Sequence, residues 1–427
     1  MLALLGLTFL ATTVIGIPIA FGLGLAAMAS ILAWGQVSLW LLPQRMFTGV
    51  DSFVFMAIPF FILAGELMTT SGILDRLVKF TDALVGHIRG GLAHVNIVAS
   101  MIFAGISGSA VADAAALGSV LIPSMTKEYD VDFGSGVCAG ASTIGPIIPP
   151  SIPMVVYALA AGSVSIAGLF LAGVIPGVLM GVGMMSIAYV IARRRRYPVR
   201  PHALPVRELL LRFWQVLPAL LMPVIIVGGI LGGVFTATEA AAVAVAYAVL
   251  IGFVVTKELK WEHIPPALVR SGVTTSVVFM LIATSNAVSW ILTTQQVPML
   301  IANFLKVVAP QQWMFLLIVN IFLLIVGCLM DLSAAMIMLV PILAPIATTY
   351  GVHPLHFGFL VVLNLVIGLL TPPVGVCLFV VTGIARISLE RVIRAVWPFL
   401  LWQVVVLGFV TYVPALCMAI PRLFGYQ

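Results

Sequence analysis

Charged side chains are scarce in this chain of 427 residues, since Asp, Glu, Lys and Arg together make up only 8% of it. A soluble domain of average composition carries about 25% charged residues. The hydrophobic fraction is 62% and the mean hydropathy is +1.23. The shortage of charge therefore excludes a water-soluble globular protein and indicates an integral membrane protein.

Cysteine is equally sparse, and its four positions are scattered through apolar segments. They form neither a metal-binding spacing nor a disulfide framework, so we interpret them as small apolar packing residues. Positive charge is missing from the N-terminus, where the first Lys or Arg is Arg45. Because a secretory signal peptide begins with a charged region, we expect the N-terminal segment to be a retained anchor.

What the chain does have is a series of apolar stretches of the length that crosses about 30 Å of hydrocarbon. Ten spans are predicted: 2–17, 20–41, 52–70, 134–161, 167–192, 213–231, 236–256, 272–293, 355–383 and 396–418. Two further apolar regions, 92–126 and 312–349, are broken near their middles by Gly, Ser and Asp. Their first legs, 92–104 and 312–326, reach only about 20–22 Å, so both regions are predicted to be re-entrant helical hairpins enclosed by protein.

The distribution of Lys and Arg sets the sidedness of these spans. When the basic linker 193–212 is placed in the cytoplasm, only Arg45, Lys306 and Arg422 of the twenty basic residues fall on the outer side. The net charge of +6 therefore reflects sidedness and requires no nucleic-acid partner. Both chain ends are expected on the outer side.

The same topology makes the two halves, 1–192 and 213–427, an inverted repeat with five spans and one hairpin each. The two hairpins then enter the membrane from opposite faces. Segments 71–91 and 295–311 precede the hairpins. The first of them carries charged residues among apolar ones, so it is predicted to be an interfacial amphipathic helix.

One interrupted motif occurs twice, 222 residues apart. The first copy reads GISGSAVADAAALGSVLIP from Gly105, and the second reads GCLMDLSAAMIMLVPILAP from Gly327. Each copy is followed by a segment broken by proline, STIGPIIPPSIP in the first half and VIGLLTPPVGV in the second. Duplicated, interrupted membrane helices are the best sequence signal for the binding site of a secondary transporter.

The paired prolines predict cation ligands at membrane depth. Pro149 and Pro372 lack an N–H, so the carbonyls of Gly145 and Gly368 lose their helical partners, and the next proline frees a second carbonyl in each copy. Such carbonyls, together with polar hairpin tips, suit a small hard cation. We therefore predict two pseudo-symmetric cation sites, each between a hairpin tip and a broken helix. The alternative is a pair of packing kinks whose freed groups bond to serine or water.

Four acidic residues lie at membrane depth: Glu66, Asp113, Glu239 and Asp331. Intramembrane carboxylates are functional candidates, and Asp331 is the strongest because it lies at a hairpin tip, with an N-cap role as the alternative. Helix-dipole stabilisation alone could explain Asp113. We interpret Glu66 and Glu239 as interhelical hydrogen-bonding groups or partner contacts.

Four helix N-termini are expected to converge, two at the hairpin tips past Ser107 and Asp331 and two near Ser151 and Val374. Helix N-termini favour anions because of their unpaired N–H groups and positive dipole ends. No Lys or Arg lies within these motifs. The arrangement therefore predicts a small anionic solute that binds together with cations.

The segments GISGSAVADAAALGSVLIPSM and ASTIGPIIPPSIPMVVYA, together with GLLTPPVG in the second half, resemble the large membrane subunit of the tripartite ATP-independent periplasmic (TRAP) transporters. The resemblance covers essentially the whole chain. It implies an all-helical, elevator-type importer in the bacterial inner membrane, driven by sodium and specific for an organic acid anion of the C4-dicarboxylate or sugar-acid type. It also implies two partners, a periplasmic substrate-binding protein and a separate small membrane subunit of about four helices. No organic cofactor and no enzymatic activity are expected.

The resemblance further implies which residues act. The sodium ligands would come from the tips and the broken helices: Ser107, Gly108, Ser109 and Gly145 for one site, and Gly327, Asp331, Gly368 and Thr371 for the other. The substrate would lie among Ser107, Ser109, Thr143, Asp331, Ser333, Thr371 and Pro373. The mobile transport domain would be 92–161 plus 312–383, and the remaining spans would form the scaffold.

Two other functions fit parts of the sequence. A stand-alone sodium–dicarboxylate or citrate symporter has a similar architecture, but both tips lack the Ser-Asn-Thr signature of such proteins. An intramembrane serine protease would use a GxSG pattern such as Gly105-Ile106-Ser107-Gly108. That chemistry needs a histidine as general base, and no histidine is well placed at membrane depth.

Overall fold

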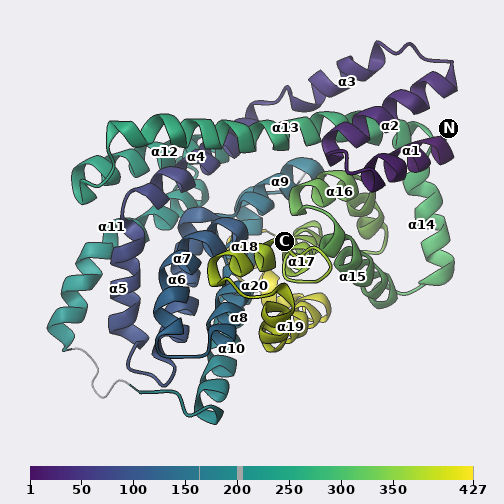
Figure 1. The fold of residues 1–427 in the computed structure, drawn as a ribbon. Helices are drawn as coiled ribbons and strands as arrows, with labels where there is room; N and C mark the ends of the chain where they lie inside the picture. Colours follow the sequence, from purple (N-terminus) through teal and green to yellow (C-terminus); the bar gives the residue numbers. More distant parts are fainter. Residues whose placement is uncertain (163, 200–204, 427) are drawn as a thin grey trace.

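The computed structural model describes residues 1–162, 164–199 and 205–426, and within them every regular element is a helix (Figure 1). Eight of the described helices are long and apolar enough to cross a membrane. The chain is therefore an all-helical, multi-pass membrane protein, as its composition predicts. Residues 200–204 of the predicted linker 193–212 lie outside the described residues.

The helices follow one another with short connections. The first half contains α1 (Leu2–Val14), α2 (Ile19–Trp34), α3 (Leu41–Val50), α4 (Ala57–Thr70), α5 (Ile73–Val85), α6 (Gly91–Ser107), α7 (Ala110–Thr126), α8 (Val131–Ser142), α9 (Ile152–Ala161) and α10 (Ile166–Arg194). The second half contains α11 (Val206–Leu231), α12 (Ala237–Leu250), α13 (Ile264–Thr294), α14 (Val297–Val308), α15 (Gln312–Leu329), α16 (Leu332–Thr349), α17 (Pro354–Gly368), α18 (Val376–Ala385), α19 (Leu389–Tyr412) and α20 (Ala415–Leu423).

Both predicted hairpins break where the motif places the break. After α6 ends at Ser107, Gly108 has a φ of +60°, a conformation that glycine adopts without strain because it lacks a Cβ. Ser109 then caps α7 by accepting a hydrogen bond from a backbone N–H at 3.4 Å. In the second copy, Asp331 caps α16 by accepting from the N–H of Ser333 at 2.9 Å. The two caps occupy equivalent positions in the repeat.

The hairpin legs are longer than predicted. Helices α6 and α7 have 17 residues each, and α15 and α16 have 18 residues each. A glycine inside a helix costs only about 1 kcal/mol, so Gly105 and Gly327 do not end the first legs. Helices α15 and α16 are therefore long enough to cross a membrane, so the prediction of short legs was wrong for the second hairpin, whereas α6 and α7 stay below that length.

The predicted spans are also divided differently. Spans 2–17 and 20–41 correspond to the short helices α1 and α2, which have 13 and 16 residues. The span prediction missed α3, because Gln44 and Arg45 lower its hydropathy. Spans 134–161 and 355–383 are each two helices separated by the proline-containing break, as predicted.

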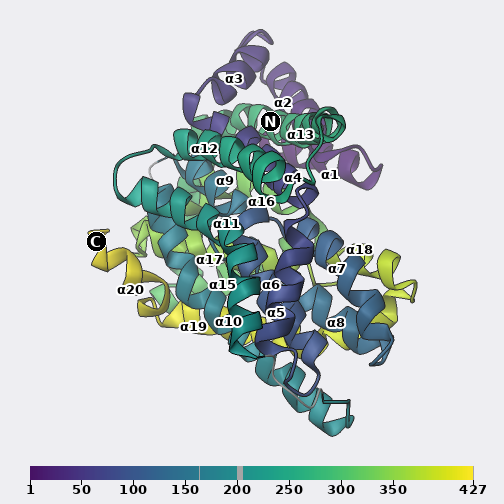
Figure 2. The ribbon, with the colours of Figure 1, turned by 90° about the vertical axis from the view of Figure 1, so that its left-hand side faces the viewer.

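The helices pack in two groups, and Figures 1 and 2 show most of the first group above the second, with α11 running beside α5. The first, which we call the frame, contains α1–α4 and α11–α13, with α12 packed on α4 and α13 packed on α2 and α3. The second, which we call the hairpin body, contains α6–α10 and α15–α20, with α19 packed on α8 and α15 on α17. Helices α5 and α14 each contact both groups.

Two carboxylates of the frame have different partners. Glu66 of α4 accepts a hydrogen bond from Arg270 of α13 at 2.9 Å, which confirms an interhelical contact. Glu239 instead accepts from the N–H and the hydroxyl of Thr236 at 2.8 and 2.9 Å, and so forms a capping box at the start of α12. The interhelical interpretation of Glu239 was wrong because a local partner lies three residues away.

A polar cluster fastens the end of α10 to the start of α8. Asp130 accepts hydrogen bonds from the Tyr197 hydroxyl at 2.7 Å and from Arg195 at 2.9 Å. The ring of Tyr197 lies 4.9 Å from that of Tyr129, measured between centroids. The Tyr197 hydroxyl, followed by the Arg195 guanidinium, holds the pKa of the Asp130 carboxyl below its usual value of 3.8.

We expect Asp130→Asn to speed tryptic cleavage after Arg195 about two- to fivefold, because exposed ion pairs contribute about 0.2–1 kcal/mol. The depressed pKa means that the carboxylate stabilises the cluster above its usual pKa, and that this contribution is lost as the pH falls through the folded-state pKa. Hydrogen exchange in the unmodified chain should therefore rise below about pH 4. Asp75→Asn, at an exposed position of α5, is the control. Equal cleavage rates in both variants would show that Asp130 does not hold the end of α10 to the start of α8.

Candidate functional site

The first hairpin tip and the first broken helix meet at Asp113. The Ser107 hydroxyl donates a hydrogen bond to Oδ1 of Asp113, whose side chain is fully buried. The other oxygen, Oδ2, has no hydrogen-bond partner among the described residues. It lies against Gly145, where any Cβ would collide with it. A carboxylate thus joins Ser107 and Gly145, two of the residues predicted for one cation site.

In the sequence, Asp113 ranks below Asp331 as a functional candidate, because helix-dipole stabilisation alone could explain it. It lies on the far side of the hairpin break from Ser107, and the turn at Gly108 brings the two side chains together. Its equivalent in the second copy is Ala335, so comparison of the two copies does not single it out. The available signal was a carboxylate within an otherwise apolar leg, which membrane proteins rarely keep without a function.

Two further residues of the first copy face the protein interior. A Cβ on Gly108 would lie 2.8 Å from the carbonyl oxygen of Pro150, so the tip rests directly on the broken segment. Thr143, predicted to contact substrate, is fully buried, and its hydroxyl donates to the carbonyl of Gly140 at 2.8 Å. Thr143 therefore supports the bend of the broken helix.

The second tip meets the second broken helix through glycine. A Cβ on Gly368 would lie 2.5 Å from the carbonyl carbon of Gly327. The N–H of Val374 donates to the carbonyl of Cys328 at 3.2 Å, which ties the break to the end of α15. The Thr371 hydroxyl donates to a carbonyl of α17 at 3.0 Å. The structure therefore brings Gly327 and Gly368 together, with Thr371 turned to its own helix.

Three of the four carbonyls freed by proline have local partners. The Ser151 hydroxyl donates to the Pro146 carbonyl at 2.5 Å. The N–H of Thr371 donates to the Gly368 carbonyl at 2.9 Å, and another backbone N–H donates to the Leu369 carbonyl at 3.2 Å. The prediction of bare carbonyls is wrong for these three, because a nearby serine hydroxyl supplies the donor in the first copy and the irregular backbone supplies both donors in the second.

Both tips line one cavity of about 190 Å³. Its wall combines the two tips, the start of α9, the end of α17 and the frame helices α4 and α13: Ile62, Gly108, Ser109, Ala110, Val111, Ile152, Pro153, Thr274, Val278, Asp331, Leu332, Ser333 and Leu369. Pockets for drug-sized ligands measure about 300–1,000 Å³. The cavity is therefore of a size for a small organic molecule.

The predicted substrate residues divide into two sets. Ser109, Asp331 and Ser333 line the cavity, and the other four do not: Ser107, Thr143, Thr371 and Pro373. Asp331 is exposed, and its carboxylate caps α16, so the tip position and the N-cap role coexist in one residue.

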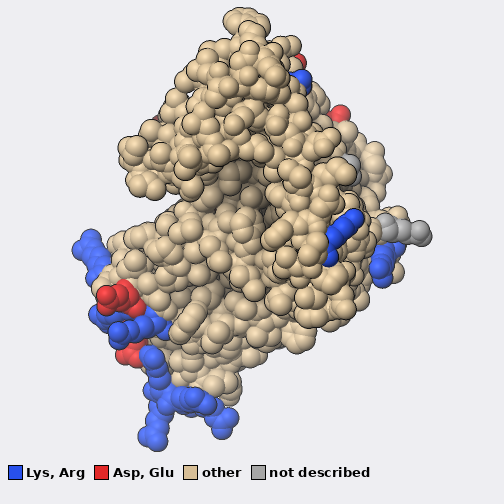
Figure 3. Space-filling model, turned by 90° about the vertical axis from the view of Figure 1, so that its right-hand side faces the viewer, with Lys and Arg blue, Asp and Glu red and all other residues tan. Residues whose placement is uncertain are grey.

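Apart from the Asp331 carboxylate, the wall of the cavity is suited to an anion. Helices α7, α9 and α16 all begin at it, and their N-terminal N–H groups present positive dipole ends. The fourth predicted N-terminus, that of α18, contributes no residue to the described wall, and neither does any Lys or Arg. Figure 3 shows a hollow between the upper and lower parts of the molecule that is surrounded by uncharged residues, while Lys, Arg, Asp and Glu gather toward the edges of this face.

The sequence also matches known proteins over almost its full length. The family model of the tripartite ATP-independent periplasmic transporter, DctM component, matches residues 7–416. The chain belongs to this family. It is 43% identical over 404 residues to the C4-dicarboxylate TRAP transporter large permease protein DctM of Pseudomonas aeruginosa, with 94% of each chain covered. It is 40% identical over 413 residues to the sialic acid TRAP transporter large permease protein SiaM of Vibrio cholerae, with 96% of each chain covered.

Membership of the TRAP family confirms the resemblance found in the motifs. A TRAP large permease is a multi-pass transporter of the inner membrane and not an enzyme, which excludes the intramembrane protease. The fold is also similar to that of the YdaH transporter of Alcanivorax borkumensis, with a TM-score of 0.58 and 15% identity over 86% of this chain and 88% of that one. At this identity the likeness supports the transporter fold alone.

Proposed function

We propose that this TRAP permease imports a small organic acid anion together with sodium by an elevator movement. The observation that carries the proposal is a cavity lined by both hairpin tips and by the frame. A solute bound there touches the hairpin body on one side and the frame on the other. Sliding of the hairpin body along the frame would expose the solute to each face of the membrane in turn.

The buried Asp113 supports sodium as the coupling ion. A buried carboxylate needs a compensating charge or hydrogen bonds to all its acceptors, and Oδ2 of Asp113 has neither among the described residues. Carboxylate, hydroxyl and carbonyl oxygens are the ligands that small hard cations prefer. We therefore propose that Asp113, Ser107 and Gly145 contribute to one sodium site, with Gly108 and Ser109 of the tip beside them.

The second sodium site is proposed at the second tip, with Gly327, Asp331, Gly368 and Thr371. The carboxylate of Asp331 lies at the cavity wall, where it would repel an organic anion unless a cation neutralises it. Sodium binding would thus order the tip and remove this repulsion before the anion binds, which couples the two ligands through a shared site.

Packing supports a larger mobile part than 92–161 plus 312–383. Helix α10 packs on α6, α8 and α17, and α19 packs on α8, α17 and α18. We propose that α10 and α19 move with the hairpins, so that the whole hairpin body is the transport domain. Helices α5 and α14, which contact both groups, would act as arms of an inverted repeat whose two termini are periplasmic.

The substrate and the partners follow from the family. Relatives carry the names of different substrates, C4-dicarboxylate in one and sialic acid in another. We propose a C4-dicarboxylate or a small sugar acid, because the cavity of about 190 Å³ favours a compact anion. A small membrane subunit of about four helices and a periplasmic binding protein would complete the transporter.

Two substitutions at the tips test the sodium assignments. We expect Ser107→Ala and Asp331→Ala each to weaken sodium-dependent uptake without preventing membrane insertion. Asp331→Ser separates the loss of the charge from the loss of the helix cap. Serine is also a good N-cap, so this variant keeps the start of α16 and removes only the charge. Unchanged sodium dependence in Ser107→Ala and Asp331→Ala would remove both assignments.

The test of the proposed function is uptake of radiolabelled organic anions into proteoliposomes that contain this chain and its small subunit. An inward sodium gradient is imposed with and without the cognate binding protein. Uptake that requires both supports the tripartite sodium symporter. Sodium-driven uptake without the binding protein would favour the stand-alone symporter, and uptake that ignores the sodium gradient would overturn the coupling.

A further inference from the structure

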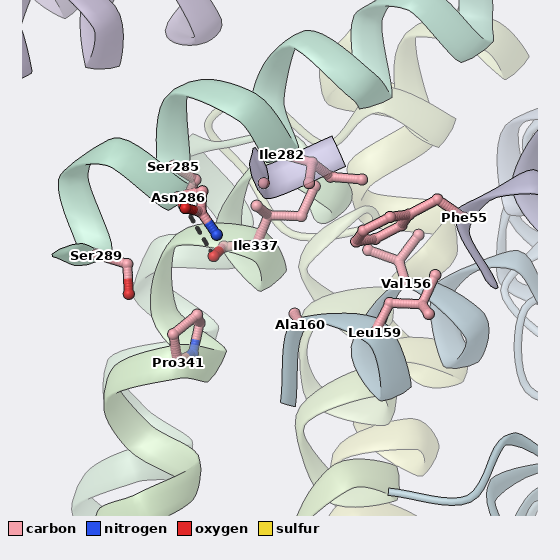
Figure 4. Close-up of a pocket in the computed structure, with 11 residues that line it drawn as sticks. Phe55, Val156, Leu159, Ala160, Ile282, Ser285, Asn286, Ser289, Ile337 and Pro341 are labelled. Carbon is pink, nitrogen blue, oxygen red and sulfur yellow. Dashed lines mark hydrogen bonds between the residues drawn. The ribbon is translucent and has the colours of Figure 1, made fainter. Parts of the chain in front are cut away.

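A hydrogen bond crosses from the frame to the hairpin body beside a second cavity. The buried Ser285 of α13 donates its hydroxyl to the carbonyl oxygen of Ile337 in α16 at 3.0 Å. Figure 4 shows this bond and the neighbouring Ser289, which faces α16 near Pro341. These four residues line a cavity of about 170 Å³.

The Ile337 carbonyl needs an outside donor because of Pro341. Within α16, the N–H four residues further on would normally bond to this carbonyl, and proline has none. The residue equivalent to Pro341 in the first half is Ser119, which keeps its N–H. The freed carbonyl is therefore a feature of the second hairpin alone, and Ser285 satisfies it across the boundary between the two groups.

Further hydroxyls continue along the same face of α13. Ser285, Ser289 and Thr293 are spaced four residues apart, so they lie one above another about 6 Å apart and cover about 12 Å of the helix. In the opposite direction the same spacing meets only Leu281 and Val277. At this spacing, donors are available only toward the C-terminal end of α13, and the next cavity-lining hydroxyl in the other direction is that of Thr274, eleven residues away.

We propose that Ser285, Ser289 and Thr293 form a hydroxyl track that guides the hairpin body along the frame. As α16 slides toward the C-terminal end of α13, the Ile337 carbonyl passes from Ser285 to Ser289 and then to Thr293. Without the track, the carbonyl would stay unpaired in an environment poor in water, which is strongly unfavourable. The present contact is the first position of the track, at its N-terminal end on α13. The inference rests on the proposed elevator function.

A double-mutant cycle tests the hydrogen bond without transport. Ser285→Ala should lower the melting temperature of the purified chain. In a Pro341→Ala background the same substitution should have a much smaller effect, because the alanine introduced there restores the helical N–H donor to Ile337. An equal fall in melting temperature in both backgrounds would show that the hydrogen bond from Ser285 does not compensate for the N–H that Pro341 lacks.

Cross-linking tests the sliding, in a Cys328→Ala background that removes the partly exposed thiol. A Ser285→Cys/Ile337→Cys pair reports the register of the structure, and a Ser289→Cys/Ile337→Cys pair reports the register one turn further. Both pairs should link with a short bifunctional reagent in native membranes. Linking of the first pair alone would overturn the track, whatever the outcome of uptake assays.

Transport provides the third readout. Ser289→Ala should slow the initial rate of uptake about two- to tenfold, the effect of one hydrogen bond, with unchanged melting temperature and KM. Ser276→Ala is the matched control on α13, since its hydroxyl bonds to the carbonyl of Gly272 in its own helix. Normal uptake in Ser289→Ala would refute the track alone, whereas absence of uptake in the unmodified transporter would refute the proposed function.

Discussion

Asp113→Asn is expected to abolish sodium-dependent uptake while the chain remains folded and inserted. Asparagine has nearly the same volume, and its amide oxygen can still accept the hydrogen bond from Ser107. It has no negative charge, and its NH₂ group would point donors toward Gly145, where Oδ2 now lies. Loss of one charged interaction of about 1.5–3 kcal/mol lowers sodium affinity about 10- to 100-fold.

Thermal unfolding measures the same effect without a substrate. Sodium that binds the native chain raises its melting temperature in proportion to the logarithm of concentration over Kd. We expect this rise in the unmodified chain and in the control Asp51→Asn, an exposed carboxylate after α3. The rise should be smaller in Asp113→Asn than in the control, because only the second proposed sodium site remains in that variant. The same sodium titration in all three proteins would remove Asp113 from the site.

Gly368→Ala is expected to abolish uptake and to lower the melting temperature. The added Cβ would lie 2.5 Å from the carbonyl carbon and 2.6 Å from the Cα of Gly327. Because both atoms belong to the backbone, no side chain can move aside, and α15 must separate from α17. Overpacking of this kind costs about 1–3 kcal/mol or more, and it distorts the second tip where we propose a sodium site.

Two other alanine substitutions make this prediction specific. Gly327→Ala should be milder, because its Cβ would lie 3.3 Å from the Cα of Gly368, which is tight but not overlapping. Gly383→Ala should be neutral or slightly stabilising, because nothing lies within 4 Å of its Cβ and alanine favours the helix. Uptake and melting temperature should thus fall in the order Gly383→Ala, Gly327→Ala, Gly368→Ala, and any other order would contradict the close contact.

The positions of the helix breaks could be read from the sequence because their causes are local. Gly108 accepts a positive φ, Ser109 and Asp331 cap the helices that follow, and the prolines remove N–H groups from the broken segments. Each cause acts within one helical turn. At Gly105 and Gly327 the prediction failed because the cause is not local: a helical glycine is tolerated once other helices pack against it.

The membrane class and the family were also accessible from the sequence, the first from the shortage of charge and the second from a long motif that occurs twice. Neither conclusion depends on which side chains touch. The same is true of the repeat, in which Ser109 and Asp331 occupy equivalent positions. Composition, periodicity and repeats are properties of the order of residues alone.

Which residues form the candidate site could be seen only in the tertiary structure. The contact of Asp113 with Gly145, the close approach of Gly327 to Gly368 and the Ser285–Ile337 hydrogen bond join helices that are distant in the chain. Such contacts depend on how closely two helix backbones approach and on which face each presents, and no local signal encodes either. The repeat even concealed Asp113, because its counterpart is Ala335. Asp113 becomes a candidate once the helices are packed, because its buried Oδ2 has no hydrogen-bond partner among the described residues.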